Sequence, residues 1–301
     1  MATTLKANTN FPATLVSEMF SKVAGRSAIA KLSRQTPIPF NGIEEFVFAL
    51  DSEAQIVGEG EAKGAGTAAT TPKVIRPVKF VYQARTSDEF LRASAEARIP
   101  TLQTFADGFA KKISRGFDIA AFHGLEPKSM TDASFKSTNS FDGLCTGNDI
   151  TYAAASIDDN IDAAVAAVMA DNGIVTGLAL SPDAGAALSH IKVNGVVQFP
   201  EFRFGQNPAA FYGMGSDVNP TVSVKKQTDT TTVHAYVGDF QNAFKWGYAA
   251  NIPLEVIEYG DPDGAGRDLK QYNEVCLRAE AYIGWGILDP DSFARIKATT
   301  T

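Results

Sequence analysis

The sequence predicts an α+β fold, and three observations support this. Residues 101–122 carry apolar side chains at every third or fourth position, which is typical of an amphipathic helix. Residues 156–191 predict a helix, a strand and a second helix, and residues 46–50 and 74–82 are β-prone runs. With 301 residues, the chain is long enough for about two domains and a sizeable core.

The helices are the clearest elements. The longest is expected to begin after Pro100 and to end near Gly124. Its apolar stripe consists of Leu102, Phe105, Phe109, Ile113 and Phe117. A second helix is expected at 156–172, a strand at 174–180, and a third helix through 191 that opens at Ser181 with Pro182 in its first turn.

The remaining segments predict shorter elements. Residues 11–35 suggest one or two helical turns within an extended arm, which ends at Pro37 and Pro39. Strands are expected at 221–224, 233–237, 244–248, 254–259 and 273–282, and a capped turn or short helix at 288–296.

Composition limits the classes of protein. A net charge of −7 argues against a general nucleic-acid binder. Two cysteines without a CxxC motif predict free thiols in a reducing compartment. No apolar run has the length of a signal peptide or a membrane span, so we expect neither export by such a signal nor a partner membrane.

Charge is arranged in blocks along the first 85 residues. Residues 1–41 have a net charge of +4, residues 42–62 of −6, and residues 63–85 of +5. Opposite charges stabilise antiparallel pairing, so the last two blocks predict the limbs of a hairpin with a flexible tip at 58–67. A long hairpin cannot bury both faces against its own chain, so we expect a second copy to cover it. The predicted intersubunit contact residues are Glu59, Glu61, Lys63, Lys73, Arg76, Lys79 and Arg85.

Catalytic motifs are absent from the sequence. Lys63 is followed by Gly64, so the glycine-rich segment does not match a Walker phosphate loop. Neither GxSxG nor HExxH occurs. Each of the three histidines, His123, His190 and His234, is expected to be a surface or hydrogen-bonded structural residue.

Two acidic clusters resemble metal sites only superficially. Asp158, Asp159 and Asp162 lie at a predicted helix start, where the helix dipole favours acids. The turn at 261–268 also resembles the start of a calcium loop. If Asp261 is taken as position one, however, Ala265 and Tyr272 occupy two of the ligand positions. We therefore predict no metal, no cofactor and no enzymatic activity.

Seven short segments, spread over nearly the whole chain, together resemble one family. They are IVGEGEA (56–62), TSDEFL (86–91), FDIAAFHG (117–124), FDGL (141–144), LSP (180–182), VGDF (237–240) and DPDSFA (289–294). In this order they are similar to motifs of the major capsid protein of tailed double-stranded-DNA bacteriophages, the Hong Kong 97 fold. One departure is Ile56, which stands where an aromatic residue is common.

The resemblance implies a domain organisation. It implies an N-terminal arm (1–42), an E-loop hairpin (43–85), a peripheral or P-domain with the long spine helix (86–152 and 240–282), and an apical or A-domain (153–239 and 283–301). In such shells the E-loop lies over a neighbouring subunit. Charge reversal at Arg76 and Lys79 is therefore predicted to impair assembly while leaving the monomer folded.

The resemblance also implies a function. The chain is expected to self-assemble, as pentamers and hexamers, into the icosahedral head shell around phage DNA. It is expected to be part of the virion and to assemble in the host cytoplasm. Further implied partners are a separate scaffolding protein, portal and decoration proteins, and the packaged DNA, which it would contact non-specifically. Some family members link their subunits covalently, which here would involve Lys63 or Lys73 with Asn273 and Glu280.

Two alternatives remain open from the sequence. A bacterial encapsulin has the same fold and would bind a cargo peptide. A cytosolic α+β enzyme would need a pocket of convergent titratable groups, and the sequence does not display one.

Overall fold

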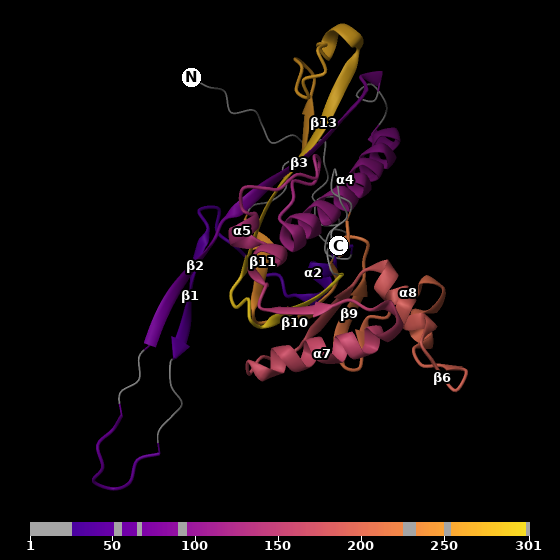
Figure 1. Cartoon of the computed structure of the whole chain (residues 1–301). Helices are drawn as coiled ribbons and strands as arrows, with labels where there is room; N and C mark the ends of the chain where they lie inside the picture. Colours follow the sequence, from indigo (N-terminus) through magenta and orange to yellow (C-terminus); the bar gives the residue numbers. More distant parts are fainter. Residues whose placement is uncertain are drawn as a thin grey trace.

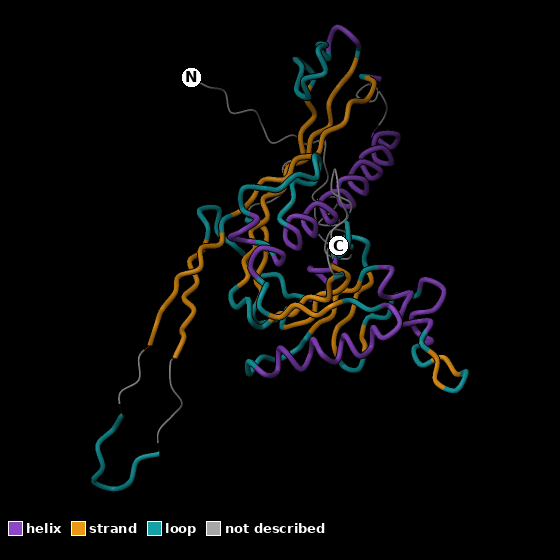
Figure 2. The backbone as a smooth tube through the Cα atoms, viewed as in Figure 1, coloured by secondary structure: helices purple, strands orange, loops and turns teal. Residues whose placement is uncertain are grey.

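A long helix and two β-sheets organise the molecule (Figure 1). The computed structural model describes residues 26–50, 56–64, 68–89, 95–224, 233–249 and 254–298. A two-stranded hairpin projects from the body, as the tube view also shows (Figure 2). The N-terminal part of the predicted arm lies outside the described residues.

The first sheet has four strands and is built around the long strand β13 (Glu274–Ile287). Strand β3 (Pro77–Ser87) pairs antiparallel with β13 over nearly its whole length. Strands β11 (Phe244–Tyr248) and β12 (Leu254–Ile257) pair with successive parts of the other edge. The strands predicted at 244–248, 254–259 and 273–282 are thus confirmed.

Helix α4 (Ala95–His123) packs on this sheet and confirms the predicted long helix. Its stripe of Leu102, Phe109, Ile113 and Phe117 is buried in the main core. The helix begins earlier than expected and contains Pro100, which removes one backbone hydrogen bond and crowds the carbonyl group four residues earlier. It ends before Gly124, where φ is +60° and a side chain would clash with the backbone of Lys136.

The second sheet has six strands of mixed direction. Their spatial order is β4 (Asn148–Thr151), β14 (Phe293–Lys297), β10 (Val233–Gly238), β5 (Gly177–Leu180), β9 (Met214–Val218) and β8 (Ala210–Phe211). Helices α7 (Ile157–Ala170) and α8 (Pro182–His190) cover one face with their apolar side chains. The Ser181 hydroxyl accepts a hydrogen bond from the Ala184 amide and caps α8, as predicted.

Short elements connect these parts. Helix α2 (Ala28–Leu32) and the end of α4 lie on the other side of the six-stranded sheet from α7. The remaining elements are α5 (Lys136–Asn139), α6 (Phe141–Leu144), β6 (Lys192–Val193), β7 (Val196–Val197), and the 3-10 turns at Ala154–Ser156, Pro200–Gly205 and Lys270–Tyr272.

One predicted strand is wrong, and the last predicted element is confirmed only as a turn. Residues 221–224 form a turn instead of a strand, because the side chain and backbone of Asn219 accept hydrogen bonds from Thr221 and Val222. Within 288–296 the capped turn is present and the short helix is not. The Asp289 carboxylate accepts hydrogen bonds from the Asp291 amide and the Ser292 hydroxyl, and the chain then extends as β14. Its position between β10 and β4 supplies backbone partners that a local sequence pattern cannot show.

The segment that was predicted to form the second limb of the hairpin is divided between two strands. Strand β1 (Ile43–Leu50) pairs with β2 (Ala68–Ile75), and the chain then passes into β3, which joins the four-stranded sheet. The basic residues Lys79 and Arg85 therefore lie opposite β13 and not opposite the acidic limb. Glu45 and Lys73 are the one oppositely charged pair in register across β1 and β2 among the described residues.

Candidate functional site

The projecting hairpin has one apolar face that no element among the described residues covers. Phe46 and Pro72 are partners across the strands, and Val74 lies two positions further on the same face. Phe46 is 57% exposed and Val74 55% exposed. A two-stranded hairpin is marginally stable alone in water, so this face needs an additional surface to pack against.

The base of the hairpin is fixed to the body. Ile75 is buried against β13, where Gly286 leaves the space: a Cβ at this glycine would lie 2.6 Å from the Ile75 side chain. Glu45 forms a 2.8 Å ion pair with Lys245 of β11. The hairpin therefore leaves the body from an anchored position, which fixes its direction.

The tip of the hairpin, residues 56–64, combines an exposed apolar side chain with two acids. Ile56 is 97% exposed, and both Glu59 and Glu61 are exposed. The Gly58 amide donates to the Glu61 carboxylate at 3.1 Å, and Gly60 adopts a φ of +84° that closes the turn. Lys63, also exposed, follows the two acids.

The structure places the other predicted contact residues at different sites. Lys73 lies half-buried on β2, and Arg76 is exposed at the junction of β2 and β3. Lys79 is engaged in its own chain, with a 2.8 Å ion pair to Glu280 and a position over the Tyr282 ring. Charge reversal at Lys79 would break this ion pair within the monomer. Of the two positions proposed for the assembly test, Arg76 is therefore the one whose reversal is expected to affect contacts between copies alone.

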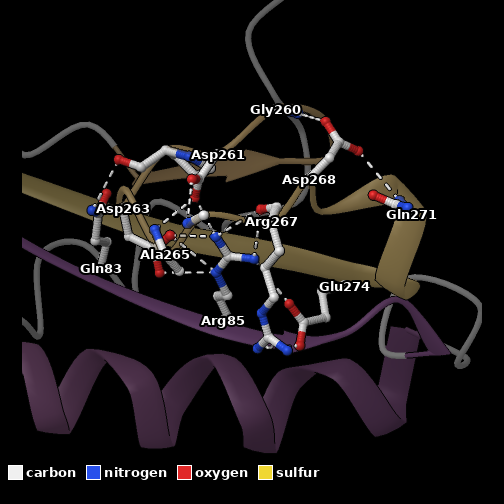
Figure 3. A network of polar contacts seen from close by, with 12 residues as sticks. Gln83, Arg85, Gly260, Asp261, Asp263, Ala265, Arg267, Asp268, Gln271 and Glu274 are labelled. Carbon is white, nitrogen blue, oxygen red and sulfur yellow. Dashed lines mark hydrogen bonds and ion pairs between the residues drawn. The ribbon is translucent and has the colours of Figure 1, made fainter.

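Arg85 is the centre of an intramolecular network at the far end of the four-stranded sheet (Figure 3). Its guanidinium contacts Asp261 at 2.6 Å and Glu274 at 3.0 Å, and it binds both carboxylate oxygens of Asp263. The hydrogen bond from Arg85 holds the pKa of Asp263 well below its usual range. Asp261 also accepts from the amide of Gly266 at 2.7 Å. The loop that resembled a calcium site is thus organised around an arginine.

Replacement of Arg85 by methionine is expected to loosen this loop. Methionine keeps the apolar stem but removes every charged hydrogen bond. Amide exchange at Ala265 and Gly266 should accelerate about tenfold or more, because local opening no longer breaks these contacts. Hydrogen exchange with mass spectrometry measures this. Arg267→Met, which loses a single ion pair to Glu274, is the control and should have a smaller effect; equal protection in wild type and Arg85→Met would contradict the assignment.

The residues considered for covalent linking are not brought together. Asn273 precedes β13, and Glu280 lies seven positions along it, a separation of about 23 Å in an extended strand. A base must lie within hydrogen-bonding distance of the group it deprotonates. Glu280 is moreover paired with Lys79. Asn273 and Glu280 therefore do not form one linking site within a single subunit.

A groove of about 750 Å³ lies between β3 and α4. Its apolar lining includes Phe80, Ile113 and Ile119. Basic side chains also line it: Lys112 and Arg115 from α4, and Lys128 from the loop that follows α4. Lys112 and Arg115 are exposed and have no ion-pair partner in the part of the chain that the structure describes. We call this the β3–α4 groove.

Sequence reasoning missed a buried polar joint at the end of α4. His123 is fully buried; its Nδ1 lies 2.8 Å from the Asp142 carboxylate and its Nε2 3.0 Å from the Thr221 carbonyl oxygen. Tyr236 donates to Asp142 at 2.8 Å, and Arg295 donates to the Asp142 carbonyl at 2.9 Å. Both histidine nitrogens are engaged, so His123 links the end of α4 to α6 and to the turn that contains Thr221.

The groups near this joint do not form a nucleophilic site. Burial would raise the pKa of Asp142, but the neighbouring His123, Tyr236 and Arg295 outweigh burial and lower it. Burial strongly raises the pKa of the Cys145 thiol, which opposes formation of the reactive thiolate. Over the described ranges, no three side chains cluster as a metal site. Likewise, no helix among these residues has the length and apolar character to span a bilayer.

Comparison with known proteins supports the shell interpretation. The sequence profile of the phage capsid family matches residues 10–298. The chain belongs to the phage capsid family. The predicted resemblance to tailed-phage major capsid proteins and the α+β capsid fold are confirmed, and the chain is a structural protein of a capsid shell.

Individual relatives agree with the family assignment. A solved chain from Mycobacterium phage Ogopogo is 31% identical with a TM-score of 0.76, and the match covers 91% of this chain and 92% of that one. A chain from Gordonia phage Cozz is 25% identical with a TM-score of 0.72, covering 92% and 87%. The probable major capsid protein gp17 of Mycobacterium phage D29 is 23% identical over 299 residues, covering 93% and 87%. These phage relatives favour a phage capsid over a bacterial encapsulin.

Proposed function

We propose that this capsid protein self-assembles, as pentamers and hexamers, into a closed icosahedral head shell around phage double-stranded DNA, with the hairpin of each copy lying across a neighbour. The observation that carries the proposal is the exposed apolar face of an anchored, projecting hairpin. Burying such a face against a second copy supplies hydrophobic stabilisation that the described part of its own chain does not.

We assign the parts of the chain to the four domains that the resemblance implies, with one shift. Residues 1–42 are the N-terminal arm, 86–152 and 240–282 the P-domain, and 153–239 and 283–301 the A-domain. The E-loop was expected at 43–85. Because β3 pairs with β13, we count residues 77–85 with the P-domain sheet and end the projecting hairpin at Ile75.

Among the predicted contact residues, we assign intersubunit roles to Glu59, Glu61, Lys63, Lys73 and Arg76. They lie on the hairpin or at its base, and no ion pair within the described residues neutralises the charges at the tip. Complementary charges on neighbouring copies increase the association rate and fix the register of contacts. Lys79 and Arg85 instead stabilise the fold of the subunit.

The remaining partners follow from the function. The protein acts as a structural component without catalysis or a cofactor, and copies assemble in the host cytoplasm before they form part of the virion. A separate scaffolding protein, portal and decoration proteins are the proposed protein partners. Contact with the packaged DNA would be non-specific, and the net charge of −7 would keep it weak.

Polar substitution of the hairpin's apolar face is expected to prevent shell formation. In Phe46→Ser/Val74→Ser, each contact with a neighbour loses about 2–3 kcal/mol of hydrophobic stabilisation, and a symmetric shell repeats this loss at every copy. Electron microscopy and sedimentation of the recombinant protein, alone and with a scaffolding protein, measure the yield of closed particles. We expect particles from the wild type and folded, unassembled subunits from the variant.

The matched control changes two exposed apolar side chains elsewhere. Met169 and Ile174, beside the end of α7, are 62% and 65% exposed, and Met169→Ser/Ile174→Ser should assemble more readily than the hairpin variant. Normal particle yield from the hairpin variant would contradict its role. Persistent monodisperse monomers of the wild type, with and without scaffold, would overturn the proposed function.

A further inference from the structure

Three Asn-Gly steps occur in the sequence, at residues 41–42, 172–173 and 194–195. In such a step the backbone nitrogen of the glycine can attack Cγ of the asparagine. An N–Cγ bond forms, the Cγ–Nδ2 bond breaks, and ammonia leaves with the proton of the backbone amide. Water then opens the cyclic imide at either carbonyl group and leaves aspartate or isoaspartate. Glycine has no Cβ to hinder the attack, so the rate in a folded chain depends on how freely its backbone can move.

Two of the three steps are held by backbone hydrogen bonds. The Gly42 amide donates to the Pro39 carbonyl oxygen at 2.8 Å, and the Gly173 amide donates to the Val168 carbonyl oxygen at 3.0 Å. These bonds must break before either nitrogen can turn toward the asparagine side chain that precedes it. Both steps are therefore expected to react slowly in the folded subunit.

The third step forms the turn of the β6–β7 hairpin. Val193 of β6 pairs with Val196 of β7, so Asn194 and Gly195 are the two residues of the turn. Their φ angles are +51° and +82°, which is typical of the type I′ turns that connect two strands directly. Both residues are exposed. The Gly195 amide donates no hydrogen bond within the described part of the chain.

This hairpin can open at little cost to the rest of the subunit. Each strand has only two residues, and a two-stranded hairpin is marginally stable alone in water. Val193 is 54% exposed and Val196 65% exposed, and neither belongs to a hydrophobic core. Figure 1 shows β6 at the edge of the molecule, beyond α8. Local opening therefore lets the backbone at Asn194 rotate while both sheets stay folded.

We propose that Asn194 is a site of spontaneous modification, at which the folded subunit converts asparagine to aspartate and isoaspartate. Water is the only co-reactant, and ammonia is released. Each conversion adds one negative charge to the hairpin, two residues from Lys192. Isoaspartate also lengthens the backbone of the turn by one atom, which disturbs the pairing of β6 with β7. The modification goes beyond the assembly proposed above and does not depend on it.

Peptide mapping of the full-length subunit, incubated at mildly alkaline pH, tests the proposal. Trypsin cleaves after Lys192 and Arg203, so Asn194 lies in a short peptide apart from the other two steps. Mass spectrometry detects the replacement of NH2 by OH, and an isoaspartate-specific methyltransferase labels the second product. In the folded subunit, the step at 194–195 should react at least about tenfold faster than the step at 41–42 or 172–173.

The same measurement in urea is the matched control. Without the folded structure, the three steps should react within about threefold of one another, because no backbone hydrogen bond protects any of them. Equal rates at the three steps in the folded subunit would overturn the proposal. So would the same preference for 194–195 in urea, because the selectivity would then belong to the adjoining residues and not to the exposed turn.

Two variants complete the test. Asn194→Gln keeps the side-chain amide but would have to close a six-membered ring, so conversion at this position should fall at least about tenfold. Asn194→Asp reproduces the added charge and should melt at the wild-type temperature, because the hairpin lies outside the cores. Conversion that persists in Asn194→Gln, or a clearly lower melting temperature of Asn194→Asp, would contradict the assignment.

Discussion

Phe141→Ala is expected to lower the free energy of unfolding of the subunit by about 3–5 kcal/mol, since truncation of a fully buried phenylalanine removes its transfer energy and leaves a cavity. Total stabilities of single proteins are about 5–15 kcal/mol, so this is a large fraction. Five aromatic rings lie with centroids 4.9–5.7 Å from the Phe141 ring: Phe122, Tyr236, Phe240, Phe244 and Phe293.

These rings explain why the effect should extend beyond α6. They come from α4, from β10 and β14 of the six-stranded sheet, from the turn that follows β10, and from β11 of the four-stranded sheet, so Phe141 packs where the two sheets meet. Denaturant unfolding of the unassembled subunit measures the loss. Phe204→Ala is the matched control, because Phe204 is 95% exposed and its truncation should change the free energy of unfolding by less than about 0.5 kcal/mol. A similarly small loss for Phe141→Ala would show that the aromatic packing around Phe141 contributes little to the stability of the subunit.

Asp118→Asn is expected to change how the stability of the subunit depends on pH. Asp118 is fully buried on α4 and accepts hydrogen bonds from the Ala28 amide and the Thr221 hydroxyl, so it caps the start of α2. Ser27 also donates to this carboxylate. Burial raises the pKa of Asp118 to about 6, and these hydrogen bonds only partly oppose the shift.

The direction of this pH dependence follows from the number of protons that the folded and unfolded states bind. An unfolded aspartate has a pKa near 3.9, so between about pH 4 and pH 6 the folded subunit holds more protons than the unfolded chain. The contribution of Asp118 is therefore fully present below about pH 4 and is lost as pH rises through 6, by about 3 kcal/mol in total. The difference in unfolding free energy, wild type minus Asp118→Asn, should fall by this order between pH 4 and pH 7.

Urea unfolding of the unassembled subunit at several pH values provides the measurement. Asp142→Asn is a control of opposite sign: the folded-state pKa of Asp142 lies below its usual value, so its contribution is present at neutral pH and is lost as pH falls. A wild-type minus Asp118→Asn difference that is flat or rises with pH would show that the hydrogen bonds to Asp118 outweigh its burial.

Elements whose signals are local could be predicted from the sequence. The stripe from Leu102 to Phe117 predicted α4, because spacings of three and four place side chains on one side of a helix whatever surrounds it. Ser181 and Pro182 predicted the start of α8, since capping depends on groups within one turn. The exposed tip followed from its glycines and charges.

Elements whose neighbours are distant in sequence could not be predicted. The run from Val74 to Tyr82 is uniformly β-prone, yet it divides near Arg76, because β2 pairs with β1 and β3 pairs with β13. The basic residues predicted on one limb of the hairpin are divided between β2 and β3 in the same way. Lys79 and Arg85 became ion-pair partners of residues about 180–200 positions away. Neither the β3–α4 groove nor the polar joint at His123 has a motif, because each is assembled from separate segments.

By itself, the sequence determined the α+β class, the principal helices, the order of the family's motifs and the presence of a hairpin with an acidic tip. Only the tertiary structure decided which basic residues of the predicted hairpin form ion pairs within the subunit and where the β3–α4 groove lies. The physical reason is range: helix periodicity and capping act within a few residues, whereas strand partners, ion pairs and grooves depend on which distant segments are brought together.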